Sequence, residues 1–360
     1  MKRILVTGSL GYIGSELTKY LKEKKYICSG LDIGYFKDCK LMETNDEDTI
    51  LHDLRNFDED QLKNIDAVVH LAGISNDPVN LPIPNREKIY EPSRIYTKKI
   101  AKLCKKNNIK FIFPSSCSVY GKGNGKLLDE NSNVNPQTYY SQNKLQIESD
   151  LCEMSNESFS PIILRLATVF GLSSRVRFDV VINMFIGMGI TTGKIILNSD
   201  GNAWRPNVHI LDVCQAFEKA IQYENNEKKP LILNVGSTKN NYKIIDLANF
   251  VKENIPGCEI NFLAENLKIN NMESESKEKW KNGVDRRTYK VIFSKIQKYF
   301  PGYECNWSVE NGIKDTIKKL KEITFSEKEF NNKKFYRLQK LEDLRMKKMI
   351  NDDLIWINRN

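Results

Sequence analysis

Short apolar runs alternate with longer amphipathic stretches over the first half of the chain. The apolar runs have the length of β-strands and lie at residues 4–7, 26–32, 67–71, 110–114 and 162–166. Between them, residues 15–24 have helical spacing, and Ile100, Leu103 and Cys104 share one face of another helix. Strands that alternate with helices indicate a parallel sheet covered on both faces. The pattern therefore predicts an α/β fold with a doubly wound parallel sheet.

The alternation weakens after about residue 172, where glycine, proline and asparagine become frequent. We expect a first domain at 1–172, a smaller C-terminal α/β substrate lobe mainly at 173–320, and a charged helical tail at 321–360. Some segments of 205–240, such as the apolar run at 231–235, should return to the first sheet. In the tail, Leu338, Leu341 and Leu344 recur at helical spacing, which predicts a helix packed on its own domain or on a second copy of the chain.

The amino-acid composition limits the classes of protein to which the chain can belong. The chain has 360 residues, of which 40% are hydrophobic and 28% charged, an ordinary balance for a globular protein. No apolar run approaches the roughly 20 residues of a membrane helix, and the N-terminus passes directly into a strand-like stretch. We therefore expect no membrane association and no secretory signal, and a cytoplasmic location.

Net charge and cysteine content argue against nucleic-acid binding, a metal site and a disulfide framework. The formal net charge is +9, but the lysines are spread along the chain without a basic run interleaved with aromatics. We therefore expect no nucleic acid as partner, whereas a small anionic ligand suits this charge. The eight cysteines are scattered and form no C-x-x-C pair, so we predict neither a metal site nor a disulfide framework.

The first strand leads directly into a glycine-rich turn. Gly8, Gly11 and Gly14 have the spacing G-x-x-G-x-x-G between the strand and the first helix. Glycine allows a tight turn and close approach of the backbone to a pyrophosphate, and the N-terminus of the helix favours negative charge. We expect the turn, including Tyr12 and Ile13, to bind the phosphates of a dinucleotide in a Rossmann-type domain.

Two aspartates suggest which dinucleotide binds. Asp32 ends the second strand, where a carboxylate accepts hydrogen bonds from both adenosine ribose hydroxyls. The same carboxylate would repel a 2′-phosphate, so the cofactor is expected to be NAD rather than NADP. The alternative is a turn or N-cap aspartate. Asp53 and Leu54 follow a later short segment and are candidates for the adenine edge.

Candidate chemistry begins with Tyr140 and Lys144, which form a Y-x-x-x-K pair. Residues four apart share a helix face, and an ammonium near a phenol lowers the pKa of the phenol. The phenolate can then take a proton from a sugar hydroxyl while hydride leaves the same carbon. The pair alone is common by chance. Ser116 strengthens the interpretation because it follows an apolar strand, at the sheet edge where ligands bind.

Taken together, these motifs resemble the extended short-chain dehydrogenase/reductase family, in its NAD-dependent nucleotide-sugar epimerase/dehydratase branch. The resemblance covers about residues 1–320, and the matching segments are the glycine turn, Asp32, residues 70–73, Ser116, Tyr140 with Lys144, and residues 165–171 and 200–213. It implies Ser116, Tyr140 and Lys144 as the catalytic triad. It also implies a cofactor site at Gly8, Gly11, Tyr12, Ile13, Gly14, Asp32, Asp53, Leu54, Leu71, Ala72, Gly73, Tyr140 and Lys144.

The same resemblance implies a nucleotide-diphosphate sugar as the substrate. Asn183 and Arg205 would contact the diphosphate, with Arg286 or Arg287 as a third contact, because guanidinium groups suit phosphate oxygens. A surface ion pair is the alternative for Arg205. The sugar subsite is expected at Ser116, Cys117, Ser118 and Thr168. A homodimer is also implied, formed by the helix near residues 98–106 and the helix that carries Tyr140.

Several positions depart from the family pattern. Members that eliminate water carry an Asp-Glu pair where this chain has Cys117 and Ser118, which disfavours a simple dehydratase. Cys117 is more readily interpreted as an inert cysteine at a strand end. A helix asparagine of the family is replaced by Tyr90, and Thr168 stands where many epimerases have Asn. His209 is expected to support the fold.

The sequence thus favours an NAD-dependent nucleotide-sugar epimerase that works through transient oxidation at sugar carbon 4. This reaction needs no metal and no carboxylate pair. A dehydratase or a dehydrogenase/reductase acting on a similar nucleotide sugar shares every motif and stays open as the alternative. A non-catalytic NAD-binding protein is the remaining possibility, although the chain keeps Ser116, Tyr140 and Lys144.

Overall fold

A seven-stranded parallel sheet forms the centre of the larger domain. The computed structural model describes residues 1–75, 89–123, 125–263 and 287–357. In spatial order the sheet contains β11 (Leu231–Val235), β7 (Ile162–Leu166), β5 (Lys110–Ser116), β4 (Ala67–His70), β1 (Arg3–Thr7), β2 (Ile27–Asp32) and β3 (Thr49–Leu51). Each neighbouring pair is parallel. The chain order reverses between β1 and β4, which is where ligands bind in such sheets.

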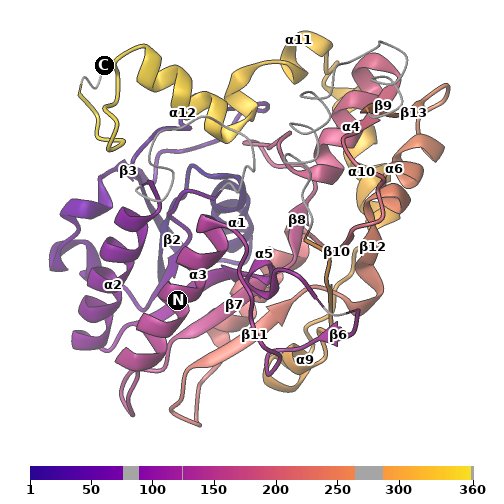
Figure 1. Cartoon of the computed structure of the whole chain (residues 1–360). Coiled ribbons are helices and arrows are strands. Elements are labelled where there is room, and N and C mark those ends of the chain that lie inside the picture. The colour runs from indigo at the N-terminus through magenta and orange to yellow at the C-terminus, as the bar shows by residue number, and fades with distance from the viewer. Residues whose placement is uncertain (76–88, 124, 264–286, 358–360) are drawn as a thin grey trace.

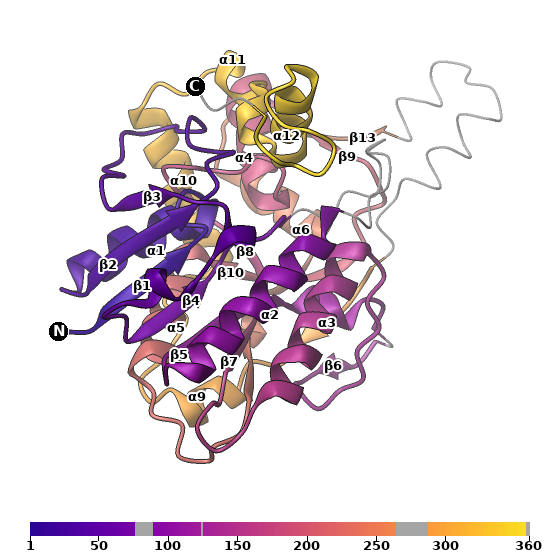
Figure 2. The ribbon, with the colours of Figure 1, turned by 90° about the vertical axis from the view of Figure 1, so that its left-hand side faces the viewer.

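Helices cover both faces of this sheet because its strands are apolar on both sides. Successive strand residues point to opposite faces, so Ile4 and Val6 enter one core and Leu5 enters the other. The first core is covered by α1 (Tyr12–Glu23) and α5 (Ile210–Gln222), and the second by α2 (Glu91–Lys106) and α3 (Tyr139–Met154). Figures 1 and 2 show α2 and α3 side by side on one face. The predicted doubly wound, Rossmann-type α/β fold is confirmed.

One segment of the predicted return to the sheet does not join it. Leu231–Val235 pairs with β7 as expected, but β10 (Trp204–His209) pairs with β8 (Thr168–Phe170) and β12 (Asn241–Lys243) in a separate three-stranded sheet. Within residues 205–240, β11 therefore joins the large sheet and α5 covers it, whereas β10 only contributes Val208 to the apolar core beneath it. An apolar run predicts a strand but does not identify the strand that pairs with it, and that choice depends on tertiary packing.

The second lobe has its own apolar core. It is built from α4 (Val181–Thr192), β9 (Lys194–Leu197), α6 (Ile244–Glu253), β13 (Glu259–Phe262) and α10 (Val309–Glu322), with β9 and β13 paired. Phe178, Phe185, Leu247 and Ile313 are buried together at its centre. The remaining short elements are β6 (Leu127–Leu128), β14 (Lys290–Val291) and α9 (Lys295–Tyr299).

The C-terminal tail crosses from the second lobe back to the large domain. It contains α11 (Glu327–Phe330) and α12 (Arg337–Met346), and Figure 1 shows α12 in yellow at the top of the molecule. Leu338, Leu341 and Leu344 are buried against Tyr35. Of the two alternatives for this helix, the structure places it on its own chain. In the part of the chain that is described, no helix has the length and apolar character needed to cross a membrane.

Candidate active site

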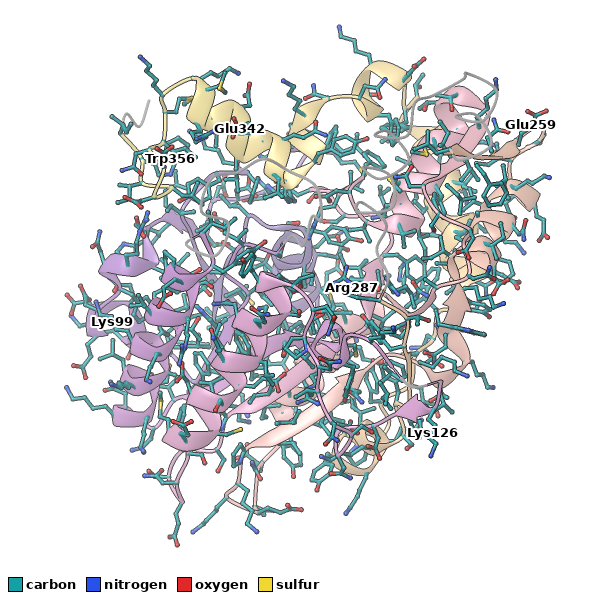
Figure 3. The ribbon with its side chains drawn as sticks, in the orientation of Figure 1. Lys99, Lys126, Glu259, Arg287, Glu342 and Trp356 are labelled. Carbon is teal, nitrogen blue, oxygen red and sulfur yellow. The ribbon has the colours of Figure 1, made fainter. Side chains whose placement is uncertain are left out.

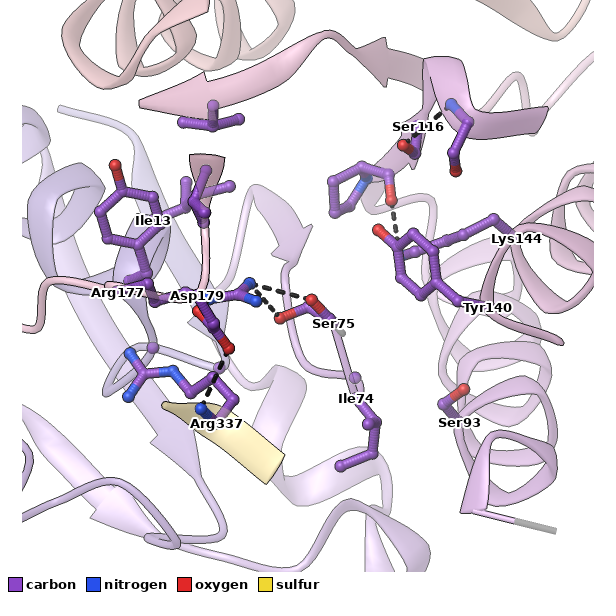
Figure 4. Close-up of a pocket in the computed structure, with 18 of the residues that line it drawn as sticks. Ile13, Ile74, Ser75, Ser93, Ser116, Tyr140, Lys144, Arg177, Asp179 and Arg337 are labelled. Carbon is purple, nitrogen blue, oxygen red and sulfur yellow. Dashed lines mark hydrogen bonds and ion pairs between the residues drawn. The ribbon is translucent and has the colours of Figure 1, made fainter. Parts of the chain in front are cut away.

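A large cavity lies between the carboxyl ends of the parallel strands and the second lobe. Its volume is about 740 Å³, within the usual range for ligand sites. The glycine turn, the ends of β2, β4 and β5, helix α3 and the second lobe all contribute to its wall. Figure 4 shows Ile13, Ser116, Tyr140 and Lys144 around this space. The tertiary fold therefore brings the predicted cofactor residues and the predicted catalytic residues to one site.

The glycine turn is packed so tightly that it has no room for side chains. Gly8 has a φ of 73°, and a Cβ there would lie 2.7 Å from the backbone nitrogen of Ala72. A Cβ on Gly14 would overlap the carbonyl oxygen of Gly8. Gly11 begins α1, where no side chain caps the helix and no acidic residue lies in the first turn. The open, positive end of the helix thus faces the cavity, as a pyrophosphate site requires.

Asp32 lies at the end of β2 and lines the same cavity. Its carboxylate accepts hydrogen bonds from the backbone nitrogens of Gly34 at 2.7 Å and Leu10 at 3.0 Å. Burial raises the pKa of Asp32, and the two N–H donors oppose that rise. Each carboxylate oxygen retains a further lone pair, so the group is able to accept bonds from two ribose hydroxyls.

Asp53 and Leu54, which were predicted to lie near the adenine, both line the cavity. Asp53 is already engaged: its carboxylate contacts Arg55 at 2.6 Å and accepts a bond from the Arg55 backbone nitrogen at 3.0 Å. Asp53 therefore shapes this wall mainly through Arg55. Leu71, Ala72 and Gly73, which follow β4, line the cavity next to the glycine turn.

His70 fixes the end of β4 beneath the cofactor site. Its Nδ1 lies 2.8 Å from the hydroxyl of Thr7, and its Nε2 lies 2.8 Å from the hydroxyl of Thr97. Burial lowers the pKa of His70 to about 3, so the ring is neutral at physiological pH. A neutral imidazole donates through one nitrogen and accepts through the other, which suits two hydroxyl partners. His70 thus joins β1, β4 and α2.

Tyr140 and Lys144 enter the cavity from the first turns of α3, which Thr138 caps by accepting a bond from the Ser141 backbone nitrogen. The Lys144 ammonium donates to the carbonyl oxygen of Pro114 at 2.8 Å and lies 5.8 Å from the centroid of the Tyr140 ring. Burial lowers the pKa of Lys144 to about 7. The phenol and the ammonium share one wall of the cavity (Figure 4).

A buried ion pair that was not predicted from the sequence packs behind this wall of the cavity. Glu148, one turn after Lys144, contacts the Arg165 guanidinium at 2.7 Å, and both side chains are at most 5% exposed. Arg165 also donates to the Tyr120 hydroxyl at 3.1 Å, and Tyr120 donates to Asn234 at 2.9 Å. The only hint in the sequence was the helical spacing that places Glu148 on the face of Lys144. The network connects α3 to β7 and β11.

Two serines at the carboxyl end of β5 line the cavity, whereas the cysteine between them does not. Ser116 and Ser118 both line the cavity. The Ser116 hydroxyl accepts a bond from the Ser118 backbone nitrogen at 3.2 Å, and the Ser118 hydroxyl is buried without a hydrogen-bond partner among the described residues. Cys117 is 1% exposed, and its thiol donates to the carbonyl oxygen of Arg165 at 3.3 Å. The predicted substrate role of Cys117 is therefore wrong, because the turn points its side chain into the core.

On the substrate side, Thr168, Arg205 and Arg287 line the cavity. Arg205 donates to the carbonyl oxygen of Trp204 at 2.9 Å and to that of Arg287, which anchors its guanidinium beside the Tyr289 ring. Arg286, the other candidate for a third diphosphate contact, lies outside the described residues.

Asn183 does not line the cavity, contrary to its predicted role as a diphosphate contact. Its side-chain oxygen accepts from the Gly171 backbone nitrogen at 3.0 Å. Its amide nitrogen donates to the Tyr12 hydroxyl at 3.2 Å and to the Arg177 carbonyl oxygen at 3.1 Å. The side chain is fully buried, so it serves as a brace that holds the glycine turn against the second lobe. Helix position alone did not reveal which face of α4 it occupies.

Arg177, which was not among the predicted site residues, also lines the cavity. Arg177 donates to the Ser75 carbonyl oxygen at 2.9 Å and hydroxyl at 3.0 Å, and its Nε donates to Asp179 at 2.8 Å (Figure 4). It therefore connects the second lobe to the segment after β4. The R-x-R-F-D run after Gly171 was the available signal.

His209 has the structural role expected for it. Its ring stacks on Trp307 with centroids 4.3 Å apart, and its Nδ1 accepts from the Leu211 backbone nitrogen at 3.4 Å. Burial lowers its pKa to about 4.

Comparison with known proteins agrees with this geometry. A Bacillus subtilis (strain 168) protein named "Uncharacterized UDP-glucose epimerase YtcB" is 32% identical over 229 residues, which cover 58% of this chain and 69% of the relative. Solved structures share the fold. TunA, described as an NAD-dependent NDP-hexosamine 5,6-dehydratase, has a TM-score of 0.74 at 18% identity over 89% of this chain and 98% of its own.

A Bacillus cereus UDP-glucuronic acid 4-epimerase, solved with UDP-glucuronic acid and NAD, has a TM-score of 0.71 at 24% identity over 89% of this chain and 99% of its own. A family model covers more than half of the chain: residues 4–236 match the model of the NAD dependent epimerase/dehydratase family. The chain belongs to the NAD dependent epimerase/dehydratase family.

Proposed function

We propose that this protein is an NAD-dependent nucleotide-sugar epimerase that inverts carbon 4 through a transient keto sugar. The observation that carries the proposal is that Tyr140 and Lys144 share a cavity with the glycine turn and Asp32. A phenol, an ammonium and a dinucleotide site in one cavity are the parts that a reversible alcohol oxidation needs. The relative named as a UDP-glucose epimerase supports the choice of reaction.

The residues present fit NAD. Gly8 and Gly14 allow the turn to pack its own backbone so closely that a Cβ would clash, and the uncapped start of α1 would hold the pyrophosphate. Asp32 would accept the ribose hydroxyls, and its negative charge favours a cofactor without a 2′-phosphate. When bound, the nicotinamide supplies a hydride acceptor that becomes a hydride donor in the second half of the reaction.

The chain's own groups would move the proton. Tyr140 as phenolate removes the proton from the 4-hydroxyl as hydride leaves carbon 4, and the Lys144 ammonium stabilises the phenolate. The Ser116 hydroxyl would hold the same oxygen of the sugar. After the keto sugar has rotated in the site, hydride would return to the opposite face of carbon 4. Tyr140 would then return the proton to the oxygen on that carbon. Protons, hydride and cofactor are restored at the end of the cycle.

The same wall argues against elimination of water. A dehydratase needs an acid and a base next to the catalytic hydroxyl, and this chain has Cys117 and Ser118 there. The Cys117 thiol is buried, and burial raises its pKa, so it is a poor acid–base group. Glu148 lies close to Lys144 in the sequence but is held by Arg165. Epimerisation uses only the groups that face the cavity.

The binding partner is proposed to be a nucleoside-diphosphate sugar. Arg205 and Arg287 line the side of the cavity opposite the glycine turn and would contact the diphosphate, with Thr168 and Ser118 near the sugar. Arg177, which already connects the two lobes, adds positive charge between these subsites.

The test is a turnover screen of the purified protein with NAD and UDP-, GDP-, dTDP- and CDP-hexoses. Proton NMR of the sugar, absorbance of NADH and product mass are recorded together. The proposal expects a 4-epimer with unchanged mass and no net NADH. Accumulation of NADH would instead identify a dehydrogenase, and loss of water a dehydratase; either result overturns the epimerase assignment.

We also propose that the protein forms a homodimer through α2 and α3. These helices lie side by side, joined by Arg94 and Lys98 on Asp150, and Ile95 is 62% exposed on α2. Sedimentation analysis of the wild type and of Ile95→Lys tests this: a dimer that becomes monomeric in the variant is expected, and a wild-type monomer contradicts it.

A cytoplasmic location is proposed as well. All eight cysteines are free, and most are buried, which suits a reducing compartment. Fractionation of the native cells with an antibody to the protein tests this location.

A further inference from the structure

The C-terminal tail, defined here as residues 323–357, forms part of the wall of the cavity at its Asp32 end. Arg337, Leu341, Glu342 and Arg345 of α12 and the loop residues Asp352, Asp353 and Leu354 line the same cavity as Asp32, Asp53 and Leu54. We infer that this tail caps the adenosine end of the NAD site and holds the dinucleotide in place between turnovers. The inference rests on the proposed function only for the identity of the cofactor.

The beginning of the tail is fixed to the second lobe. Phe330 and Phe335 are buried in the core of that lobe, where their rings contact Phe178 with centroids 5.3 Å and 5.7 Å away. The Phe335 carbonyl oxygen also accepts a bond from the Phe178 backbone nitrogen at 3.1 Å. The tail therefore leaves the second lobe from a defined point.

After this point α12 forms part of the cavity wall, and its leucines are buried. Leu338, Leu341 and Leu344 are at most 4% exposed and form a small core with Tyr35 and Ile350. Tyr35 belongs to the segment directly after Asp32. Figures 1 and 3 show α12, with Glu342 labelled on it, above the large domain. The helix thus packs on the segment that begins with the proposed ribose ligand.

The last residues of the tail are tied to both segments of the adenosine site. The Trp356 indole nitrogen donates to the Ile33 carbonyl oxygen at 2.8 Å, and its ring lies beside that of Tyr35, with centroids 5.7 Å apart. Arg55, which also binds Asp53, donates to the Asp353 carbonyl oxygen at 2.9 Å. The last residues of the tail are therefore held both on the segment that follows Asp32 and on the segment that follows Asp53.

The wall that the tail supplies suits a nucleoside. Arg337 is 4% exposed, lies 4.3 Å from the Phe36 ring centroid and donates to the Arg175 carbonyl oxygen at 3.0 Å. Its Nη1 is buried and has no hydrogen-bond partner in the described part of the chain, so a donor remains for a ligand oxygen. Leu341 adds an apolar surface for a flat base.

This arrangement predicts slow release of the cofactor. The dinucleotide cannot leave at its adenosine end unless the tail undocks, and undocking breaks the Trp356 contacts and exposes the leucines of α12. Retention suits an enzyme in which NAD is restored at the end of each turnover, because exchange with the bulk pool is not needed.

The test compares the full-length wild type with Trp356→Ala and with the control Met346→Ala. Met346 lies on the same helix, is 74% exposed and is not among the cavity-lining residues. Each protein is loaded with NAD and desalted, and the NAD still bound is measured over time. A hydrogen bond and a ring contact of this kind are together worth about a factor of ten in an equilibrium, so Trp356→Ala should release NAD about tenfold faster. The control should match the wild type.

A second readout guards against a variant that simply misfolds. Hydrogen–deuterium exchange of the amides in residues 338–354 should slow when NAD binds the wild type, and this protection should shrink in Trp356→Ala while protection of α1 persists. The inference that the tail caps the NAD site would be overturned by two results together. These are equal rates of NAD release from wild type and Trp356→Ala, and no NAD-dependent protection of residues 338–354. A wild type that retains NAD but converts no nucleotide sugar contradicts the proposed function alone. A wild type that does not bind NAD contradicts both.

Discussion

Lys144 is held on the sheet by Pro114, whose carbonyl oxygen accepts a hydrogen bond from its ammonium at 2.8 Å. Pro114 lies in β5, two positions before Ser116, so the same strand end fixes the ammonium and presents the hydroxyl. Tyr140, one helical turn earlier on α3, completes the group. The positions of all three groups thus follow from the packing of one helix on one strand.

Replacing Tyr140 by Phe should remove catalysis without removing the cofactor. The variant keeps the ring that packs against Tyr90, with centroids 6.3 Å apart, and loses only the hydroxyl. Turnover of the nucleotide sugar should fall by about 10²–10⁴-fold, the usual contribution of a general base. NAD retention and thermal stability should match the wild type. Turnover close to that of the wild type would show that another group accepts the proton.

The pH dependence of stability should report on Lys144. Its pKa in the folded protein is about 7 because of burial, compared with an ordinary value of 10.5. Between these pH values the unfolded chain binds a proton that the folded protein does not. The Lys144 contribution to the free energy of unfolding therefore rises with pH, by about 1.4 kcal/mol per unit within the window.

The measurement for Lys144 is urea unfolding of wild type and Lys144→Met without cofactor, at pH 6 to 9. Other titrating groups act on both proteins, so the difference between them isolates the lysine. The wild type should gain stability relative to the variant as pH rises above about 7. Parallel curves for the two proteins would contradict a depressed pKa at this position.

The buried pair of Glu148 and Arg165 should be costly to break. Glu148→Gln leaves the Arg165 guanidinium in the core without a charged partner, and we expect a loss of about 3–5 kcal/mol in the free energy of unfolding. Glu224→Gln is the matched control, because Glu224 pairs with Lys2 at side-chain exposures of 74% and 43%. It should change stability by less than about 1 kcal/mol. Similar small effects of both substitutions would show that the buried pair is not structural.

Gly14→Ala should disrupt the phosphate-binding turn. The new Cβ would overlap the Gly8 carbonyl oxygen, and backbone atoms on both sides cannot move aside independently. NAD affinity, measured by calorimetry, should fall by about tenfold or more, because the turn must open.

Gly193→Ala provides the control for Gly14→Ala. Gly193 caps α4 with a φ of 67°, and a Cβ there meets no atom within 4 Å among the described residues. It should lose only about 1 kcal/mol of stability through strain, with unchanged NAD affinity. Equal NAD affinities of the two variants would count against the proposed pyrophosphate site.

Ser118→Ala should separate stability from substrate binding. The Ser118 hydroxyl is buried at the cavity wall without a partner among the described residues, so its removal should leave stability unchanged or raise it by about 1 kcal/mol. The KM for the sugar should rise by about 2–10-fold, the value of one hydrogen bond.

The control for this substitution is Ser115→Ala, whose hydroxyl donates to Glu148. It should lower stability because it removes a partner from the buried pair. A KM for Ser118→Ala equal to that of the wild type would remove Ser118 from the sugar subsite.

Local patterns predicted much of the large domain, and the residues proposed for the cofactor site line one cavity. Gly8, Gly11, Gly14 and Asp32 are constrained by turn geometry and by the end of a strand, so their spacing along the chain identifies them. Cys117 and Asn183 were assigned from position in a motif, and both side chains turned out to face the core. Sequence position does not specify which way a side chain points after a strand end or on a helix that is apolar on several faces.

The alternation of strands and helices, the glycine turn and the Tyr140–Lys144 pair could be predicted from the sequence, because each depends on residues close together in the chain. Three other relationships depend on tertiary packing: β10 lies outside the large sheet, Arg165 neutralises Glu148, and Trp356 donates to the Ile33 carbonyl oxygen. These contacts join residues far apart in sequence. They form because burial of apolar surface brings the segments together and buried polar groups must then find partners, and neither requirement is visible in a local pattern.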